Sequence, residues 1–508
     1  MRKRMFLPLC LFLTCQTFSQ QASTAPAVAR KGHRAERQIS KSEAFDLSTP
    51  SAWQYAIGAA ERLLQTHVQN LAVPGMQVSV ASHGKTIWSG SFGYANLAAK
   101  VPVSQDTSFR IGSISKSLTA AGVGLLVQKH LLDLDAPVRR YVPSFPEKRW
   151  AITVRQIAGH LGGIRHYRSE GEVNSNKHYS SVLESLAPFK DDPLLFEPGT
   201  QFAYSSYGYV LLSAVVEAAA KEPFTEFMST QVFEPLGMKH TTMDYSDRAV
   251  SSRSTFYILN DKDERIEAPP VDSSNKWGAG GMLSTAGDLV RFGNAMLRNQ
   301  LLDAATTELL LTSMNTRDGK ETGYGIGWEI RHDPKGRRVI VNDGSLPSAR
   351  AVLAIYPDHQ LVIAVLANTG TGIFFNREEA FMLADLFLDP HGLAPTPRQR
   401  RDVAGEYTYS AFIDKDSVTG KINLVDSGDS VTGTMTIPNR FFKDRVIPVP
   451  VVRVKDSEVS LIGTPGNWIS IDLEKRDDSF TGRWNFGPLS GTMHGVRHAL
   501  QRPDRGHR

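Results

Sequence analysis

Ser113 and Lys116 form the sharpest chemical pattern in the sequence, because they stand three residues apart at the start of a long apolar segment. Residues at this spacing share one face of a helix, so the lysine can reach the serine hydroxyl. A serine hydroxyl is a weak nucleophile until a base takes its proton, and a desolvated lysine can be that base. The helix start also offers free N–H groups that favour developing negative charge. The spacing alone leaves open a structural interpretation, in which Ser113 only caps the helix and Lys116 is solvated.

The same Ser-x-x-Lys spacing occurs twice more, and local context separates these copies from the first. Ser82 and Lys85 flank a predicted hairpin turn, where no helix brings them together. Ser273 and Lys276 run into the glycine-rich segment 278–281, which is a poor helix former. Ser113, in contrast, precedes a predicted helix that reaches to about Leu132.

The predicted elements that must position these residues lie along 51–390, where strands near both ends enclose a mainly helical stretch. A helical pattern and a predicted hairpin come first, a mainly helical stretch over 105–310 follows, and a second hairpin and a closing helix end the segment. This order predicts an α+β domain whose first and last strands share one antiparallel sheet. The predicted helices cover 51–70 and 376–388, and the predicted strands cover 76–80, 86–92, 349–356 and 361–367.

A second domain is predicted after the proline-rich break at 390–397. Beyond it, short alternating apolar runs separated by turns fill the region 400–500. This texture is typical of a small antiparallel β-domain, and it leaves a barrel and a sandwich equally open.

The pattern of the first 19 residues is typical of an export signal. Arg2, Lys3 and Arg4 precede an apolar stretch over 5–13 that is far too short to span a bilayer, and small residues allow cleavage after Ser19 or as late as residue 25. Polar residues then dominate 20–50, which we interpret as a flexible linker. The sequence therefore predicts an exported protein, periplasmic or secreted, without a stable membrane span.

Cysteine content and charge exclude several function classes. Both cysteines, Cys10 and Cys15, lie in the predicted signal, so we expect no disulfide, no thiolate metal site and no cysteine nucleophile in the mature chain. Of 508 residues, 41% are hydrophobic and 21% are charged, which is ordinary for a globular protein. Without the three N-terminal cations the formal net charge falls from +5 to +2, too little for a nucleic-acid binder. No His-Glu-x-x-His pattern occurs, and we expect neither a metal nor a cofactor.

Five sequence blocks in chain order resemble the serine β-lactamase-like hydrolases of the class C type. This group includes D,D-peptidases, D-aminopeptidases and esterases, and the similarity is strongest to its mitochondrial β-lactamase-like members. The resemblance implies a β-lactamase/transpeptidase-like fold, with an antiparallel sheet flanked by helices and a helical subdomain. The blocks cover 109–120, 152–167, 204–209, 271–297 and 324–328.

The resemblance assigns roles around the serine. Ser113 becomes the nucleophile, and Tyr204 matches the tyrosine of the family's Tyr-x-Asn motif, where a phenolate beside Lys116 would act as general base. Ser206 stands where the family has asparagine and would hydrogen-bond the lysine or the substrate. The oxyanion hole would use the backbone N–H groups of Ser113 and Ser345.

The family's third motif, Lys-Thr-Gly or His-Thr-Gly, is replaced here by Asn342, Asp343 and Gly344. We expect these three residues to line the substrate site. A neutral amide replaces the cation and a carboxylate replaces the hydroxyl, and both changes disfavour a substrate carboxylate. The sequence therefore predicts a poor β-lactamase that prefers neutral esters, amides or peptide ends.

Our reading is an exported serine hydrolase that forms an acyl-enzyme with a small-molecule or peptide substrate. Two rival interpretations stay open: a non-catalytic β-lactamase-like interaction or assembly protein, which the Asn342-Asp343 departure supports, and a peptidoglycan D,D-peptidase. The sequence does not indicate an oligomeric state.

Overall fold

The computed structural model describes residues 53–70, 73–370, 377–388, 394–413, 416–437, 445–463, 469–486 and 489–498. The predicted signal over 1–19 and the predicted linker over 20–50 lie outside these residues. Among the described helices, none is long and apolar enough to cross a membrane. In the same ranges, no group of three or more His, Cys, Asp or Glu side chains is placed to hold a metal ion.

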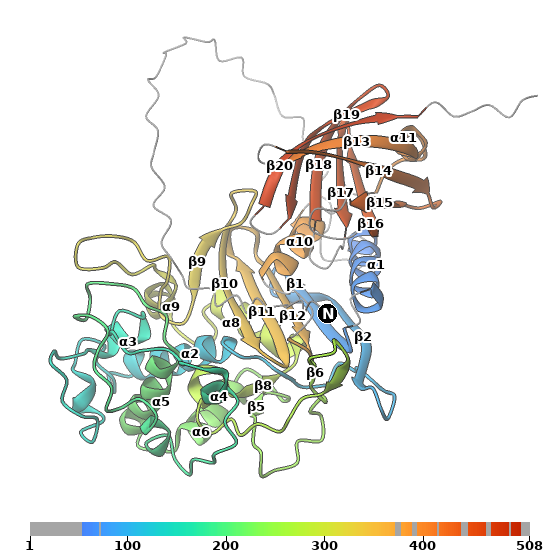
Figure 1. The fold of residues 1–508 in the computed structure, drawn as a ribbon. Coiled ribbons are helices and arrows are strands. Elements are labelled where there is room, and N and C mark those ends of the chain that lie inside the picture. Colours follow the sequence, from blue (N-terminus) through green and yellow to red (C-terminus); the bar gives the residue numbers. More distant parts are fainter. Residues whose placement is uncertain are drawn as a thin grey trace, which may run out of the picture. The chain divides into compact units, whose positions relative to one another are not determined.

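Strands from both ends of the first domain form one antiparallel sheet of seven strands, in the order β3-β2-β1-β12-β11-β10-β9 (Figure 1). β1 pairs with β12 from Met76 opposite Ala367 to Ser82 opposite Leu361, so the prediction that the two ends share a sheet is confirmed. The strands are β1 (Gly75–Ser82), β2 (Lys85–Asn96), β3 (Val101–Pro102), β9 (Glu329–His332), β10 (Arg338–Leu346), β11 (Ala349–Tyr356) and β12 (Leu361–Ala367).

Both faces of the central strands are buried, which explains their continuous apolar runs. Along β11, Leu353 and Ile355 join one core cluster, whereas Val352 and Ala354 join the other. α1 (Gln54–Asn70) and α10 (Arg377–Leu388) contribute to the second cluster, and α8 (Ala286–Leu297) contributes to the first. Full burial of each large aliphatic side chain is worth about 1.5–3 kcal/mol. The sheet is therefore a well-packed support for the residues that its strands position.

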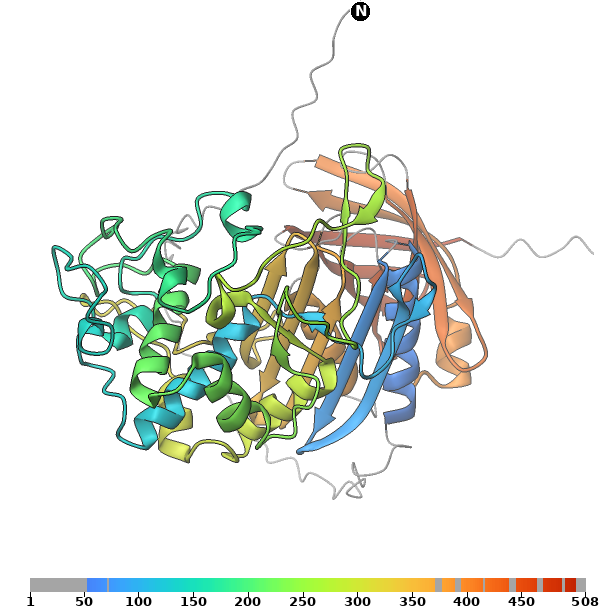
Figure 2. The same cartoon turned by 90° about the horizontal axis from the view of Figure 1, so that it is seen from below.

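α2 (Ile114–Gln128) connects this sheet to the helical region. It contacts α5 and α7 as well as β10 and β11, and Figure 2 shows the cyan and green helices beside the yellow strands. Short strands form two further small sheets in the same stretch. The other helices are α3 (Val154–Ala158), α4 (Glu170–Val173), α5 (Ser206–Ala220), α6 (Phe224–Phe227), α7 (Trp277–Gly280) and α9 (Ala304–Leu311). The small strands are β4 (Phe109–Arg110), β5 (Thr242–Met243), β6 (Tyr257–Leu259), β7 (Arg265–Glu267) and β8 (Met282–Ser284).

The C-terminal strands close into an eight-stranded barrel, because β13 pairs with β20 as well as with β14. Closure leaves no unpaired sheet edge, and it decides between the two architectures that the sequence left open. Buried side chains such as Tyr407, Leu461 and Trp484 fill the interior. The strands are β13 (Gly405–Ile413), β14 (Asp416–Asp426), β15 (Val431–Ile437), β16 (Arg445–Lys455), β17 (Glu458–Gly463), β18 (Ile469–Arg476), β19 (Ser479–Phe486) and β20 (Leu489–Arg497), and α11 (Pro397–Val403) precedes them.

Candidate active site

Ser113 stands immediately before α2, and its hydroxyl meets two proton-carrying side chains. Lys116 Nζ lies 3.0 Å from Ser113 Oγ, and the Tyr204 hydroxyl donates to the same oxygen at 2.7 Å. The Ser113 side chain makes no capping hydrogen bond, so the interpretation of Ser113 as a mere helix cap does not describe this structure. The structure thus brings together three residues that the sequence analysis placed in the catalytic centre.

Lys116 is fully buried, although a lysine seldom is. Its ammonium donates to the Ala279 carbonyl at 2.6 Å and lies 4.9 Å above the Tyr204 ring. Burial lowers the pKa of Lys116 to about 7, and the Asp343 carboxylate opposes this shift. A large fraction of the lysine is therefore neutral near pH 7, the form that can accept the Ser113 proton.

Tyr204 is positioned by the turn that starts α5. The Ser205 hydroxyl accepts a hydrogen bond from the Gly208 N–H and donates one to the Arg165 carbonyl. The His160 ring packs against the Tyr204 ring with centroids 4.4 Å apart. These contacts hold the phenol in one orientation, with its hydroxyl on Ser113.

The surroundings of the Tyr204 phenol disfavour the phenolate that the family resemblance implies. Burial raises its pKa well above the usual range, and the Asp343 and Glu329 carboxylates add to that rise. The hydrogen bond to Ser113 opposes the shift without reversing it. These shifts favour Lys116 over Tyr204 as a proton acceptor, and they leave the Tyr204 hydroxyl suited to donating a proton.

Gly344 lets β10 approach the nucleophile. A Cβ on Gly344 would lie 1.9 Å from the Ile111 carbonyl oxygen, so no side chain fits there. On the opposite side, a Cβ on Gly112 would lie 3.0 Å from the Ser345 backbone nitrogen. The Ser345 N–H is thus held next to the residue that precedes Ser113, close to where the resemblance expects an oxyanion hole.

We expect Gly344→Ala to lower kcat at least about 100-fold, because the strand must move away from Ile111 and carry the Ser345 N–H with it. Hydrolysis of a p-nitrophenyl ester measures the effect. Gly495→Ala is the matched control, since this glycine also lies in a strand, β20, and a Cβ there would meet no atom closer than 3.6 Å. Equal activity of the two variants would contradict the close-approach argument.

The Asn342 amide is directed into the protein, in contrast to the expected substrate contact. Its Nδ2 donates to Ser117 Oγ at 2.9 Å and to the Gly327 carbonyl at 3.0 Å. With 4% of its surface exposed, Asn342 ties β10 to α2. The amide replaces a cation of the family motif with a structural contact.

Asp343 belongs to a charge cluster that the sequence analysis missed. The Arg377 guanidinium donates to Asp343 at 2.7 Å and to Glu329 at 2.6 Å. Burial raises the pKa of Asp343, and Arg377 opposes that rise. Arg350, another cation near this carboxylate, donates to the Leu346 and Ala349 carbonyls of the β10–β11 turn.

Ser206 is buried at the start of α5. Its hydroxyl shares a hydrogen bond with Tyr167, and its backbone N–H donates to His166 Nδ1 at 3.1 Å. The Ser206 side chain therefore faces the loop before α4. This differs from the expectation that its hydroxyl contacts Lys116 or the substrate.

The two other Ser-x-x-Lys pairs hold local structure. Ser82 and Lys85 are paired across the β1–β2 turn. Ser273 Oγ donates to Asp244 at 3.2 Å, and Lys276 Nζ donates to the Asn275 side chain at 2.9 Å. Neither pair forms the serine–lysine hydrogen bond that Ser113 and Lys116 share.

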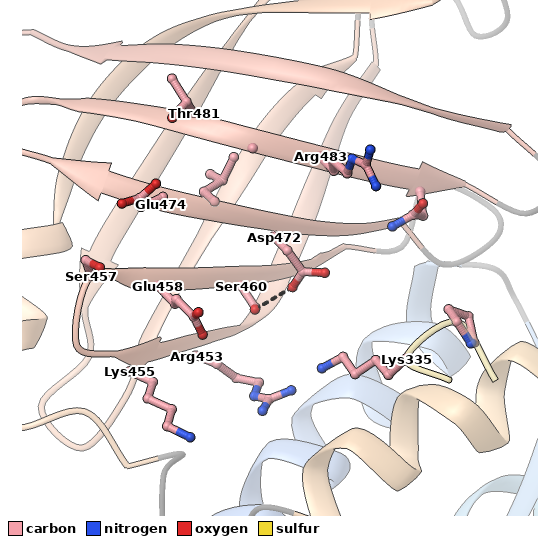
Figure 3. Close-up of a pocket in the computed structure, with 14 residues that line it drawn as sticks. Lys335, Arg453, Lys455, Ser457, Glu458, Ser460, Asp472, Glu474, Thr481 and Arg483 are labelled. Atoms are coloured by element: carbon pink, nitrogen blue, oxygen red, sulfur yellow. Dashed lines mark hydrogen bonds between the residues drawn. The ribbon is translucent and has the colours of Figure 1, made fainter. Parts of the chain in front are cut away.

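A separate groove of about 930 Å³ lies along the outer face of β16–β19, with Lys335 at its rim (Figure 3). Its charges alternate: Lys455 stands opposite Glu458, and Arg483 stands opposite Asp472. This mixture favours neither an anionic nor a cationic ligand. Ser113 is not among the residues that line the groove.

Comparison with known proteins agrees with this geometry. Residues 60–386 match the Beta-lactamase family. The human mitochondrial serine beta-lactamase-like protein LACTB is 34% identical over 310 residues, which cover 48% of this chain and 56% of the human protein, just over half of its length. Penicillin-binding protein 4* of Bacillus subtilis is 28% identical over 356 residues, covering 66% of this chain and 78% of that protein.

A solved structure with the same fold is the octameric penicillin-binding protein homologue from Pyrococcus abyssi, with a TM-score of 0.58 at 23% identity. The aligned region covers 86% of this chain and 99% of the Pyrococcus chain. Residues 51–390 alone are a smaller share of this chain, so the likeness extends into the C-terminal domain. The Beta-lactamase match spans well over half of the sequence. The chain therefore belongs to the beta-lactamase and penicillin-binding-protein-like family of serine hydrolases.

Proposed function

We propose that the protein is an exported serine hydrolase that cleaves neutral esters, amides or peptide ends through an acyl-enzyme. The observation that carries this proposal is the convergence of Lys116 and Tyr204 on the Ser113 hydroxyl, at 3.0 and 2.7 Å. These distances suit proton transfer between the side chains.

Acylation begins with neutral Lys116. Its Nζ takes the proton of Ser113 Oγ while Oγ forms a bond to the substrate carbonyl carbon and the carbonyl electron pair moves to oxygen. Backbone N–H groups of Ser113 and Ser345 support that negative charge. When the tetrahedral intermediate collapses, the bond to the leaving group breaks, Tyr204 protonates the leaving group, and the Lys116 ammonium returns a proton to Tyr204.

Deacylation repeats these steps with water as the nucleophile. The lysine and tyrosine pair removes a proton from water as its oxygen attacks the acyl carbon. The bond to Ser113 Oγ then breaks, and Oγ regains a proton. The transfers to and from Ser113 Oγ use hydrogen bonds that Lys116 and Tyr204 already make, and the Lys116 ammonium lies 4.9 Å from the centre of the Tyr204 ring.

The charge cluster beside the site favours substrates without a carboxylate. Two carboxylates, Asp343 and Glu329, share the Arg377 guanidinium, so that cation is occupied. An incoming carboxylate would meet Asp343 without a free partner and be repelled. We expect a neutral p-nitrophenyl ester to be hydrolysed with a far higher kcat/KM than nitrocefin, whose carboxylate is negative.

Asp343→Asn tests the origin of this preference. The variant removes the repelling carboxylate and releases one partner of Arg377, so we expect the nitrocefin-to-ester ratio of kcat/KM to rise about tenfold. The ratio is the correct measure because Asp343 also influences Lys116, which serves both substrates. Glu147→Gln removes a carboxylate whose side chain is 83% exposed and serves as the charge control. An unchanged ratio in Asp343→Asn would contradict the repulsion argument.

Localisation and the rival functions have separate tests. Export is supported by the apolar segment 5–13 after three cations, whereas the human relative is named as mitochondrial. Mass determination of the mature N-terminus in culture fractions distinguishes an exported protein from one that is retained in the cell.

The two rival functions have their own tests. A D,D-peptidase would cleave a D-alanyl-D-alanine peptide faster than its amide-capped form, and a non-catalytic protein would show no Ser113-dependent hydrolysis.

A further inference from the structure

His166 lies on the loop between α3 and α4, next to the catalytic tyrosine. Its ring meets the Tyr204 ring edge-on, with centroids 5.6 Å apart, and packs against Tyr167 at 4.8 Å. The residue is exposed to solvent. The imidazole is therefore both in contact with Tyr204 and accessible to a ligand.

Hydrogen bonding fixes which nitrogen of His166 carries the proton. The Ser206 backbone N–H donates to Nδ1 at 3.1 Å, so Nδ1 is an acceptor and the proton resides on Nε2. Burial against the neighbouring rings, with repulsion from Lys116, lowers the pKa of His166 to about 4. The ring therefore stays neutral above about pH 5, and Nε2–H is a permanent donor. Within the described ranges, the hydrogen bond of the His166 ring is made at Nδ1, on the opposite side from Nε2.

The contacts of Ser206 indicate a role for the Nε2–H group of His166. The Ser206 hydroxyl is buried and shared with Tyr167, so it offers nothing to a substrate. Its backbone N–H instead orients His166, whose exposed ring lies against Tyr204. A neutral N–H is suited to a carbonyl oxygen, because it adds no charge and does not titrate in the working pH range.

We propose that His166 is a specificity-determining residue whose Nε2–H binds a substrate carbonyl flanking the scissile bond, so that peptide-like substrates are preferred over simple acyl esters. This inference rests on the proposed serine hydrolase function. It deepens that function by naming the chemistry recognised beside the reacting carbonyl.

Three variants separate the Nε2 donor from the Nδ1 contact. His166→Phe removes both, His166→Gln places an amide N–H near the Nε2 position, and His166→Asn places an amide near the Nδ1 position. We compare p-nitrophenyl acetate with N-acetylglycine p-nitrophenyl ester, which carries a carbonyl on the acyl side. Acetyl glycolamide, an ester with a carbonyl on the leaving side, forms the second arm.

We expect His166→Phe to lower the kcat/KM ratio of a flanking-carbonyl substrate to p-nitrophenyl acetate about tenfold, and His166→Gln to restore it to within about threefold. The substrate that loses its advantage identifies the side on which the carbonyl binds. Unchanged ratios for both substrates, or rescue by Asn and not by Gln, would overturn the proposal. If the Phe variant does not fold, the comparison of Gln with Asn decides. Hydrolysis of p-nitrophenyl acetate by the unmodified protein, and its loss in Ser113→Ala, tests the proposed function separately.

Discussion

Ser113→Ala is expected to lower kcat/KM for a p-nitrophenyl ester by about 10⁴-fold or more. Alanine removes the oxygen that forms the acyl bond, and no other group in contact with Lys116 and Tyr204 replaces it. The backbone donors and the substrate site survive, so a small residual rate above the uncatalysed reaction remains. Initial rates at saturating and limiting substrate give both kcat and KM.

Ser115→Ala is the matched control on the same helix turn. The Ser115 hydroxyl is buried and has no hydrogen-bond partner among the described residues. Its loss is therefore expected to change activity by less than about threefold. If both variants lose activity equally, the defect reports damage to α2 and the assignment of Ser113 as nucleophile fails.

Lys116→Met is expected to lower kcat about 1,000-fold, within the range that a positioned general base contributes. Methionine is similar in length and apolar, so it fills the same buried space without a base. The free energy of unfolding is expected to stay equal or rise, because the buried ammonium costs desolvation. Thermal unfolding and kinetics on one preparation separate the two effects. A fall in both stability and activity would show that Lys116 acts as a structural residue.

The pH dependence of the unmodified protein tests the same role. Because burial lowers the pKa of Lys116 to about 7, the neutral, reactive amine increases as pH rises through that value. We therefore expect kcat/KM to rise tenfold per pH unit below about pH 6 and to level off above about pH 8. Asp343→Asn removes a carboxylate that favours the ammonium, so the rise should shift to lower pH. An acidic limb near the usual lysine range would contradict the base assignment.

The sequence predicted the fold well where local pattern determines it. Alternating apolar residues over 76–80 and the two runs around Pro357 predicted strands that the structure pairs as β1, β11 and β12. Spacing alone placed Lys116 on the face of Ser113, because both stand in one helix turn. Tyr204 is 91 residues from Ser113, and its role came from resemblance to a family, not from spacing.

Contacts between distant segments were not predictable in the same way. Arg377 stands 34 residues after Asp343 and reaches it only because α10 packs against β10, β11 and β12. The orientation of Asn342 depends on Gly327 and Ser117 approaching from other elements. The choice of a barrel over a sandwich depends on the pairing of β13 with β20, the first and last strands of that domain. Each case requires tertiary packing that short-range patterns do not encode.

Covalent trapping is the most direct test that Ser113 is the nucleophile. The mature protein is incubated with a serine-reactive p-nitrophenyl phosphonate and analysed by intact mass and peptide mapping. We expect one adduct per chain, located on Ser113, which forms in step with the loss of esterase activity and forms much more slowly in Lys116→Met. Loss of activity with an adduct on another residue, or full esterase activity with Ser113 quantitatively modified, would contradict it.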